Sequence, residues 1–264
     1  MTRKSSKSEG LIKRLLTGVA VVGLLVLWMM AINRTSSMRV SDMDIIIDEQ
    51  KGEKNLLSKN DVIRLIKEDL PNDISYQSIT DIDITMIEQM LNADTRILNA
   101  EVYVDAKYHL VLDIIQRRPI LRVMNQSGDQ FYVDQSGSYV RTVDKKAARV
   151  PVVTGYVETL DANGHVAFAP RLQNAYQVVD ESRKDRVLRA LIEQIHVEKS
   201  GRIIIIPKIG DEHIVLDHID GLSQKLKNLK LFYRELARTD GWNRKDEIDI
   251  SYNDQVVFRN SENP

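Results

Sequence analysis

The chain has 264 residues, of which 43% are hydrophobic and 28% are charged, a composition that favours one large or two small globular domains over disorder. Its formal net charge of −1 provides no overall basic field for nucleic acid. The sequence contains no cysteine, which excludes a disulfide scaffold, thiolate catalysis and cysteine-ligated zinc.

The N-terminal part has the pattern of a membrane anchor. Residues 1–14 form a basic tail with five basic side chains and one acidic side chain, and residues 15–32 are 18 consecutive uncharged residues. A helix of that length spans roughly 27 Å, close to the ~30 Å hydrocarbon core of a bilayer. The basic flank predicts a single transmembrane helix with a cytoplasmic N-terminus. A cleaved signal peptide is the alternative, because Thr35 and Ser37 form a passable cleavage site.

Residues 38–120 read as a small α+β module with the order strand, helix, helix, strand, strand. A strand is expected at 39–47, and a capping box of Ser58 and Asp61 opens the first helix. A second helix begins near Ile84, where Leu91 lies on the same predicted face. This order predicts one layer of helices on one face of a sheet.

Two details of this module stay open. The second helix is capped either by Asp83 or by Thr85 in a capping box. The last two strands, at 99–105 and 108–117, form a hairpin, and Pro119 either ends the ladder or sits on its edge.

Residues 121–260 are expected to form a C-terminal mixed α/β module with a mainly antiparallel sheet, followed by a polar tail at 261–264. The continuous apolar run at 203–206 is typical of a strand covered on both faces, and residues 156–180 have no readable pattern. In chain order, the predicted elements are a hairpin at 131–140, a helical face from Val187 to Ile195, three strands at 195–198, 202–207 and 213–217, a helix at 222–238, and strands at 247–252 and 255–258.

The sequence offers no catalytic or cofactor-binding constellation, so we expect no enzyme, no cofactor and no metal. His213 and His218 lie near three acidic residues, which would allow a metal site, but a turn-flanked strand with solvated ends explains them better. The basic run at 183–189 lies opposite an apolar helical face and is interpreted as solvated surface. Binding of anionic lipid or cell-wall polymer is its alternative.

The last predicted strand is the best candidate for binding a partner. An exposed sheet edge presents unpaired N–H and C=O groups, to which another chain can add a strand. The candidate contact residues are Ile250, Tyr252, Val256, Val257 and Phe258. The alternative is that these side chains simply pack on the preceding helix.

Three stretches together resemble the bacterial cell-division family FtsQ/DivIB, and the element order of the first module resembles the POTRA module. The strand pair 97–104 and 110–120 is similar to the family's pair ending in a Glu-Arg-x-Pro signature, although Gln116 replaces the glutamate. The sequence YVDQSG at 132–137 resembles the family's hydrophobic-x-Asp-x-x-Gly turn. RVPVVTG at 149–155 resembles its Leu-Pro-x-x-x-Gly segment.

The resemblance implies a non-enzymatic scaffold of the division machinery, located in the cell inner membrane and concentrated at the septum. It implies binding to FtsB- and FtsL-like single-pass partners through the C-terminal strand, where Tyr252 matches the family's strand-ending tyrosine. The runner-up function is a POTRA-type chaperone or adaptor in secretion or outer-membrane assembly. A third alternative is a periplasmic cell-wall hydrolase.

Overall fold

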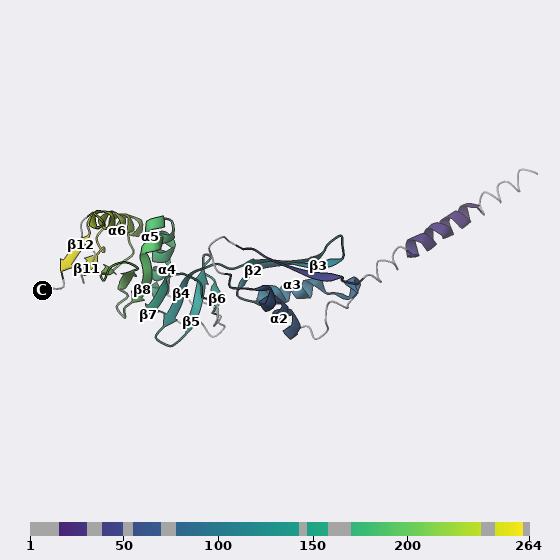
Figure 1. Cartoon of the computed structure of the whole chain (residues 1–264), viewed down its shortest axis with the longest axis horizontal. Coiled ribbons are helices and arrows are strands. Elements are labelled where there is room, and N and C mark those ends of the chain that lie inside the picture. Colours follow the sequence, from purple (N-terminus) through teal and green to yellow (C-terminus); the bar gives the residue numbers. More distant parts are fainter. Residues whose placement is uncertain are drawn as a thin grey trace, which may run out of the picture. The chain divides into compact units, whose positions relative to one another are not determined.

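The computed structural model describes residues 16–30, 39–49, 55–69, 78–142, 147–157, 170–238 and 246–260 (Figure 1). The described residues form a mixed α+β protein, as predicted. The chain divides into two compact units. The first unit comprises Met1–Asp48, Ser58–Ala93 and Asn99–Ile114, and the second comprises Glu49–Leu57, Asp94–Leu98 and Ile115–Pro264.

A helix occupies residues 16–30, within the uncharged segment, and its side chains are exposed. Within the described ranges, no helix is both long enough and apolar enough to cross a bilayer. The transmembrane helix expected at 15–32 is therefore not found in this part of the chain. The basic tail, both ends of the uncharged segment, Thr35 and Ser37 lie outside the described residues.

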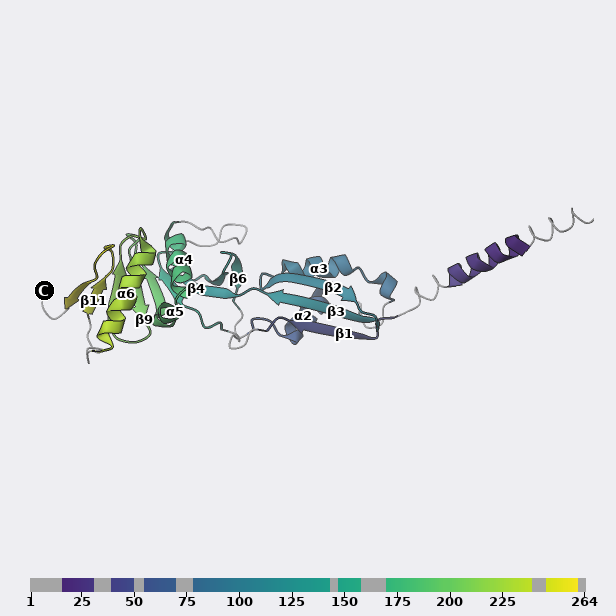
Figure 2. The same ribbon diagram turned by 90° about the horizontal axis from the view of Figure 1, so that it is seen from above.

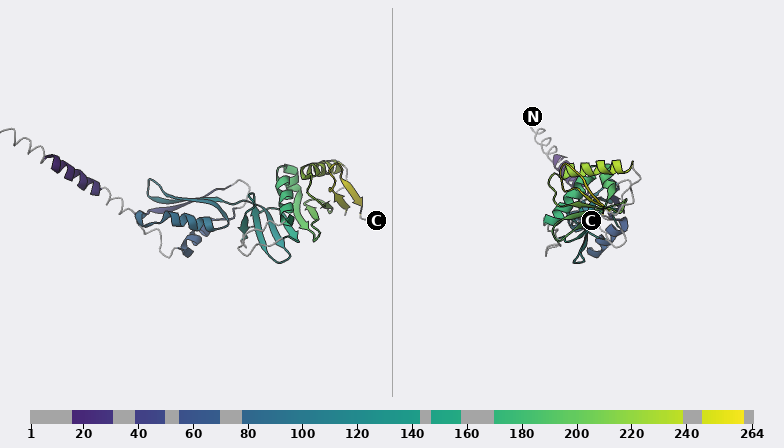
Figure 3. Two further views of the ribbon diagram at one scale, coloured as in Figure 1. Left: turned by 180° about the vertical axis from the view of Figure 1, so that it is seen from behind. Right: turned by 90° about the vertical axis from the view of Figure 1, so that its left-hand side faces the viewer.

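The first unit has the predicted order of elements. They are β1 (Asp42–Ile47), α2 (Lys59–Asp69), the short 3-10 helix η2 (Ile79–Asp81), α3 (Ile84–Ala93), β2 (Ile97–Val104) and β3 (His109–Gln116). The strands form a three-stranded sheet in the order β1-β3-β2, with β1 parallel to β3. Both α-helices lie on one face of this sheet (Figure 3, left), as one layer of helices requires.

The helix caps of the first unit follow local sequence signals. Ser58 N–H donates to Asp61 Oδ2 (2.9 Å), and Asp61 N–H donates to Ser58 Oγ (3.3 Å), so the capping box is confirmed. Asp83 caps α3, because its Oδ1 accepts from Met86 N–H (2.9 Å). Glu88, which a capping box with Thr85 would need as its second residue, accepts from Val102 N–H (2.9 Å) and so connects α3 to β2.

The second unit contains a nine-stranded sheet among the described residues, in the order β12-β11-β10-β9-β8-β7-β4-β5-β6. Five neighbouring pairs are antiparallel, whereas β4–β7, β7–β8 and β10–β11 are parallel. The elements are β4 (Pro119–Asn125), β5 (Gln130–Asp134), β6 (Tyr139–Arg141), β7 (Val152–Gly155), α4 (Pro170–Arg183), α5 (Arg186–Leu191), β8 (Ile192–Val197), β9 (Ile203–Pro207), β10 (His213–Leu216), α6 (Leu222–Leu236), β11 (Asp246–Asp249) and β12 (Val257–Asn260).

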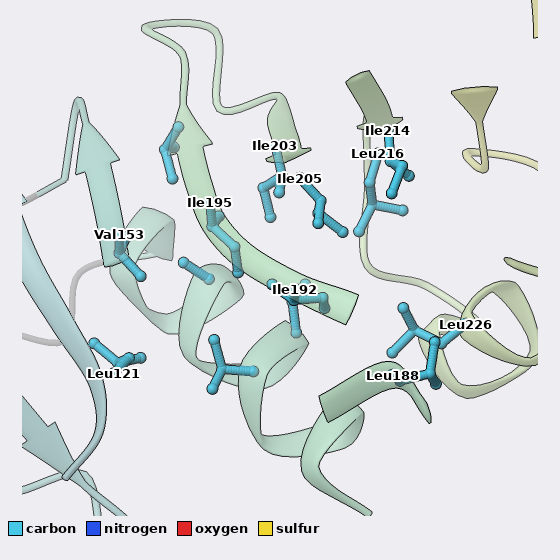
Figure 4. Packing of buried hydrophobic residues seen from close by; sticks show 14 of the residues in the cluster. Leu121, Val153, Leu188, Ile192, Ile195, Ile203, Ile205, Ile214, Leu216 and Leu226 are labelled. Atoms are coloured by element: carbon cyan, nitrogen blue, oxygen red, sulfur yellow. The ribbon is translucent and has the colours of Figure 1, made fainter. Parts of the chain in front are cut away.

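The helices α4, α5 and α6 cover one face of this sheet (Figure 2). Between the layers, alternate side chains of the strands meet the apolar faces of the helices. The close view in Figure 4 shows Leu121, Val153, Ile195, Ile203, Ile205, Ile214 and Leu216 from the sheet, with Leu188 of α5 and Leu226 of α6. The helix predicted at 222–238 is confirmed as α6, with Leu226, Leu229 and Tyr233 buried.

The helical face predicted from Val187 to Ile195 is wrong beyond Leu191. Ile192 and Ile195 lie on β8, which pairs with β7 on one side and β9 on the other. Apolar residues three apart in the sequence fit a helix, but pairing with strands on both sides stabilises extended backbone here.

The helix α4 falls partly in the stretch 156–180, which has no readable pattern in the sequence. Its buried face includes Ala175 and Ser182, which weakens the apolar signal.

Two expectations about strands are also corrected. In β9, Ile203, Ile205 and Pro207 are buried, whereas the alternating residues Ile204 and Ile206 are partly exposed on the face away from the helices. The strand is thus covered on one face rather than on both. Pro119 neither ends a ladder nor lies on its edge: it is the first residue of β4 and aligns with Asp134 of β5. Proline has no backbone N–H to donate, and this is tolerated at the first residue of a strand.

Candidate functional site

The last strand, β12, forms one end of the nine-stranded sheet. It pairs with β11, and no second strand among the described residues lies beside it. Figure 1 shows β12 in yellow at the outer edge of the second unit. Among the described residues, β12 therefore presents an open strand edge, in the region where the sequence predicted a binding surface.

The direction of each backbone group in β11 follows from its pairing with β10. Ile250 N–H donates to Val215 O (2.9 Å), and the parallel register aligns Val215 with Asp249. The N–H and C=O of one strand residue point to the same side, and this side alternates along the strand. Ile248 and Ile250 therefore face β10, while Glu247 and Asp249 face β12.

The same alternation identifies the outward groups of β12. The antiparallel register aligns Asp249 with Val257 and Glu247 with Arg259. These two are then the hydrogen-bonded pairs, since Glu247 and Asp249 face β12. Phe258 lies between them, so its N–H and C=O point to the open edge. These are the groups that an added strand would use.

The side chains of β12 differ between its two faces. The Phe258 ring lies on the helix side, 6.0 Å from the Phe232 ring of α6, and remains 38% exposed. On the opposite face, the Arg259 guanidinium pairs with Glu247 (3.1 Å) and with Asp249 (3.7 Å). The edge thus combines a partly exposed aromatic ring on one face with charged groups on the other.

Residues 250–256, here called the edge loop, connect β11 to β12. Tyr252 in this loop is 50% exposed, whereas Val256 is partly buried against the core. Tyr252 differs in this respect from Tyr233 of α6, which is buried and whose hydroxyl donates to Glu212 Oε1 (2.5 Å) inside the core. Burial and this hydrogen bond raise the pKa of Tyr233 above its ordinary value, so it stays neutral. Tyr252 is the tyrosine of this region whose ring is available at the surface.

The five candidate residues do not lie on one surface. Ile250 is fully buried in the core, so its side chain stabilises the second unit and is not free in this structure. The strands predicted at 247–252 and 255–258 are displaced to β11 and β12, which leaves Tyr252 and Val256 in the edge loop. Val257 is half-buried on the face opposite the ring of Phe258. Tyr252 and Phe258 are the exposed aromatic side chains of the candidate set.

Sequence reasoning missed the residues that hold the edge loop. Asn228 of α6 donates from its side chain to Asn253 O (2.9 Å), and Asp217 N–H donates to Ser251 Oγ (3.0 Å). No local signal marks these contacts, because Asn228 and Asp217 read as ordinary surface residues. Their partners are more than 20 residues away in the chain.

The other candidate sites of the second unit behave as surface or turn residues. His213 and His218 are exposed. No group of three histidine, aspartate or glutamate side chains among the described residues could hold a metal ion. The basic run 183–189 is divided between the end of α4 and α5, and Lys184 pairs with Glu181.

The fold defines a class of protein: a two-unit α+β chain whose larger unit has, among its described residues, an open strand edge at β12. The model of the family described as FtsQ/DivIB, C-terminal related, matches residues 118–258, which are 141 of the 264 residues. The chain belongs to this family. Its members are generally non-enzymatic division proteins, and membership indicates a role in cell division. No curated protein matches the chain.

Proposed function

We propose that this protein is a non-enzymatic, membrane-anchored scaffold of the bacterial division machinery. It recruits other divisome membrane proteins at the septum by strand addition at β12. The observation that carries the proposal is the open edge of β12, where the N–H and C=O of Phe258 point away from β11. Added main-chain hydrogen bonds supply affinity in this mode, and neighbouring side chains supply specificity.

The partners that we propose are FtsB- and FtsL-like single-pass proteins, because the family resemblance implies them. The anchor that we propose is the uncharged segment 15–32, and its basic flank favours a cytoplasmic N-terminus. The folded units would then lie in the periplasm. A POTRA-like role of the first unit as a second docking surface also belongs to this proposal.

Two substitutions at one position test strand addition. Phe258→Ala removes the ring but keeps the backbone N–H, whereas Phe258→Pro removes both. Proline is tolerated on an edge strand whose N–H faces outward, so the β11–β12 ladder should survive. We expect Phe258→Pro to weaken capture of the soluble FtsB- and FtsL-like domains by about thirtyfold, or ~2 kcal/mol. Phe258→Ala should weaken capture less.

Tyr252→Ala separates side-chain contact from backbone pairing, because Tyr252 lies in the edge loop and not in β12. It should reduce capture without affecting β12. Binding is measured by titration of the full chain in detergent, and unfolding curves check that each variant is folded. Equal affinities for Phe258→Pro and Phe258→Ala would show that no strand is added at this edge.

A further inference from the structure

A buried lysine lies next to the turn that leads into α6. Lys225, on the first turn of α6, has no exposed surface. Its Nζ lies 2.9 Å from His218 Nδ1 and donates to His218 O (2.8 Å). The His218 ring is itself at the surface. An ammonium group has only donors, so when Lys225 is charged, His218 Nδ1 is the acceptor of this hydrogen bond.

The turn that contains His218 supports the edge loop directly. This turn, residues 217–221, connects β10 to α6 and is here called the α6 turn. Its Asp217 N–H donates to Ser251 Oγ (3.0 Å). Gly221 has φ +69°, and a Cβ at this position would lie 2.3 Å from Asn253 Oδ1, so the Asn253 side chain rests against the glycine. The α6 turn and the edge loop are therefore packed together at two points.

Three carboxylates from two segments act on the buried ammonium. Asp217 and Asp220 lie in the α6 turn, and Asp249 lies on β11. Burial lowers the pKa of Lys225, while these three carboxylates raise it, and the net result is a lowered pKa. Asp217 is also paired with Arg202 (2.7 Å), so part of its charge is already neutralised.

We propose that His218 and Lys225 form an acid-sensitive latch, and that protonation of His218 opens the latch and loosens the edge loop next to β12. The hydrogen bond between the two nitrogens has room for one proton. A second proton would place two cations 2.9 Å apart, with a buried donor facing another donor. The closed latch thus binds one proton fewer than the open form, and acid favours the open form. Imidazole is the side chain that changes charge between about pH 5 and 8.

Hydrogen exchange of the full chain in detergent tests the latch without any partner, so its outcome is independent of the proposed strand addition. The reporters are the amides of Asp217 and Ser251, which donate to Ser251 Oγ and to Asp249 Oδ1. Exchange rates are measured at pH 7.5 and 5.5 and corrected for the intrinsic pH dependence. In the unmodified protein we expect protection of both amides to fall about fivefold or more at the lower pH.

Two matched variants decide the cause. His218→Gln keeps an acceptor for Lys225 but does not titrate, so its protection should be equal at the two pH values. His213→Gln changes an exposed histidine of β10 and should retain the full pH dependence. The proposal is overturned if His218→Gln shows the same loss as the unmodified protein, or if the unmodified protein shows no loss. Core amides of β8 report global unfolding in every sample.

Discussion

At the scale of single residues, the second unit contains a buried ion pair between Arg96 and Asp94. Arg96 is 1% exposed, and its guanidinium donates twice to Asp94, from Nε to Oδ1 (2.8 Å) and from Nη2 to Oδ2 (2.7 Å). Arg141 also donates to Asp94 Oδ2 (2.7 Å). A buried guanidinium needs such a partner, because an unpaired charge in the interior is very costly.

Asp94→Ala should therefore lower the free energy of unfolding by about 3–5 kcal/mol, since it leaves Arg96 buried without a carboxylate. Urea unfolding measures the change. Asp42→Ala, at an exposed position of β1, is the control and should change the stability by less than about 0.5 kcal/mol. A loss of under 1 kcal/mol in Asp94→Ala would contradict this account of the pair.

Acid should weaken the same pair. Burial raises the pKa of Asp94, but hydrogen bonds and charge from Arg96 and Arg141 outweigh it, and the pKa is lowered overall. The stabilisation is then fully present above the unfolded carboxyl pKa of about 3.9. It is lost as the pH falls through the lower pKa of the folded state. The stability difference between the unmodified protein and Asp94→Asn should shrink over this range in pH-dependent urea curves.

Gln116 illustrates a departure from the family's motif that the structure explains. Its Oε1 accepts from Leu56 N–H (2.9 Å) and its Nε2 donates to Asn55 Oδ1 (2.7 Å). A glutamate could accept but could not donate at this buried position. The amide therefore fits the segment 55–57 of the second unit better than a carboxylate would.

At the scale of elements, the backbone conformation at the end of β7 requires a glycine. Gly155 has φ +93°, and a Cβ there would lie 2.2 Å from Val197 O. That oxygen accepts from Tyr156 N–H (2.8 Å), so it is not free to move away. The parallel pairing of β7 with β8 at this point requires the close approach of the two backbones.

Gly201 provides a matched comparison, because it has the same φ of +93° and a Cβ at this position would meet no atom within 4 Å. Gly201→Ala should cost about 1–2 kcal/mol from backbone conformation alone. Gly155→Ala should cost at least ~2 kcal/mol more, because the methyl group collides with the neighbouring strand. Thermal unfolding of both variants measures the difference, and equal costs would contradict it.

At the scale of the whole molecule, we expect the proposed anchor and the folded units to have separable roles. An N-terminal fluorescent fusion of the full chain should localise to the membrane and form a band at midcell. Deleting residues 1–32 should release the fusion from the membrane, because the apolar segment and its basic flank are lost. An unrelated transmembrane segment in place of 15–32 should restore both the membrane signal and the midcell band. Diffuse fluorescence of the full-chain fusion would contradict the anchor.

The sequence predicted most of the first unit because its signals are local. The capping box of Ser58 and Asp61, the helix near Ile84 and the final hairpin depend on residues close together in the chain. The same holds for the apolar stripe of α6. Where local pattern and tertiary pairing disagreed, as at Ile192 and Ile195, pairing with neighbouring strands decided the structure.

The sequence by itself determined the family motifs, the α+β class and the region of the chain that contains the candidate edge. Only the tertiary structure decided that Ile250 is buried and that the backbone of Phe258 faces outward. The physical reason is that β10 and β11 pair across about 30 residues of chain. Their register sets which groups of β11 face β12, and no local periodicity encodes that register.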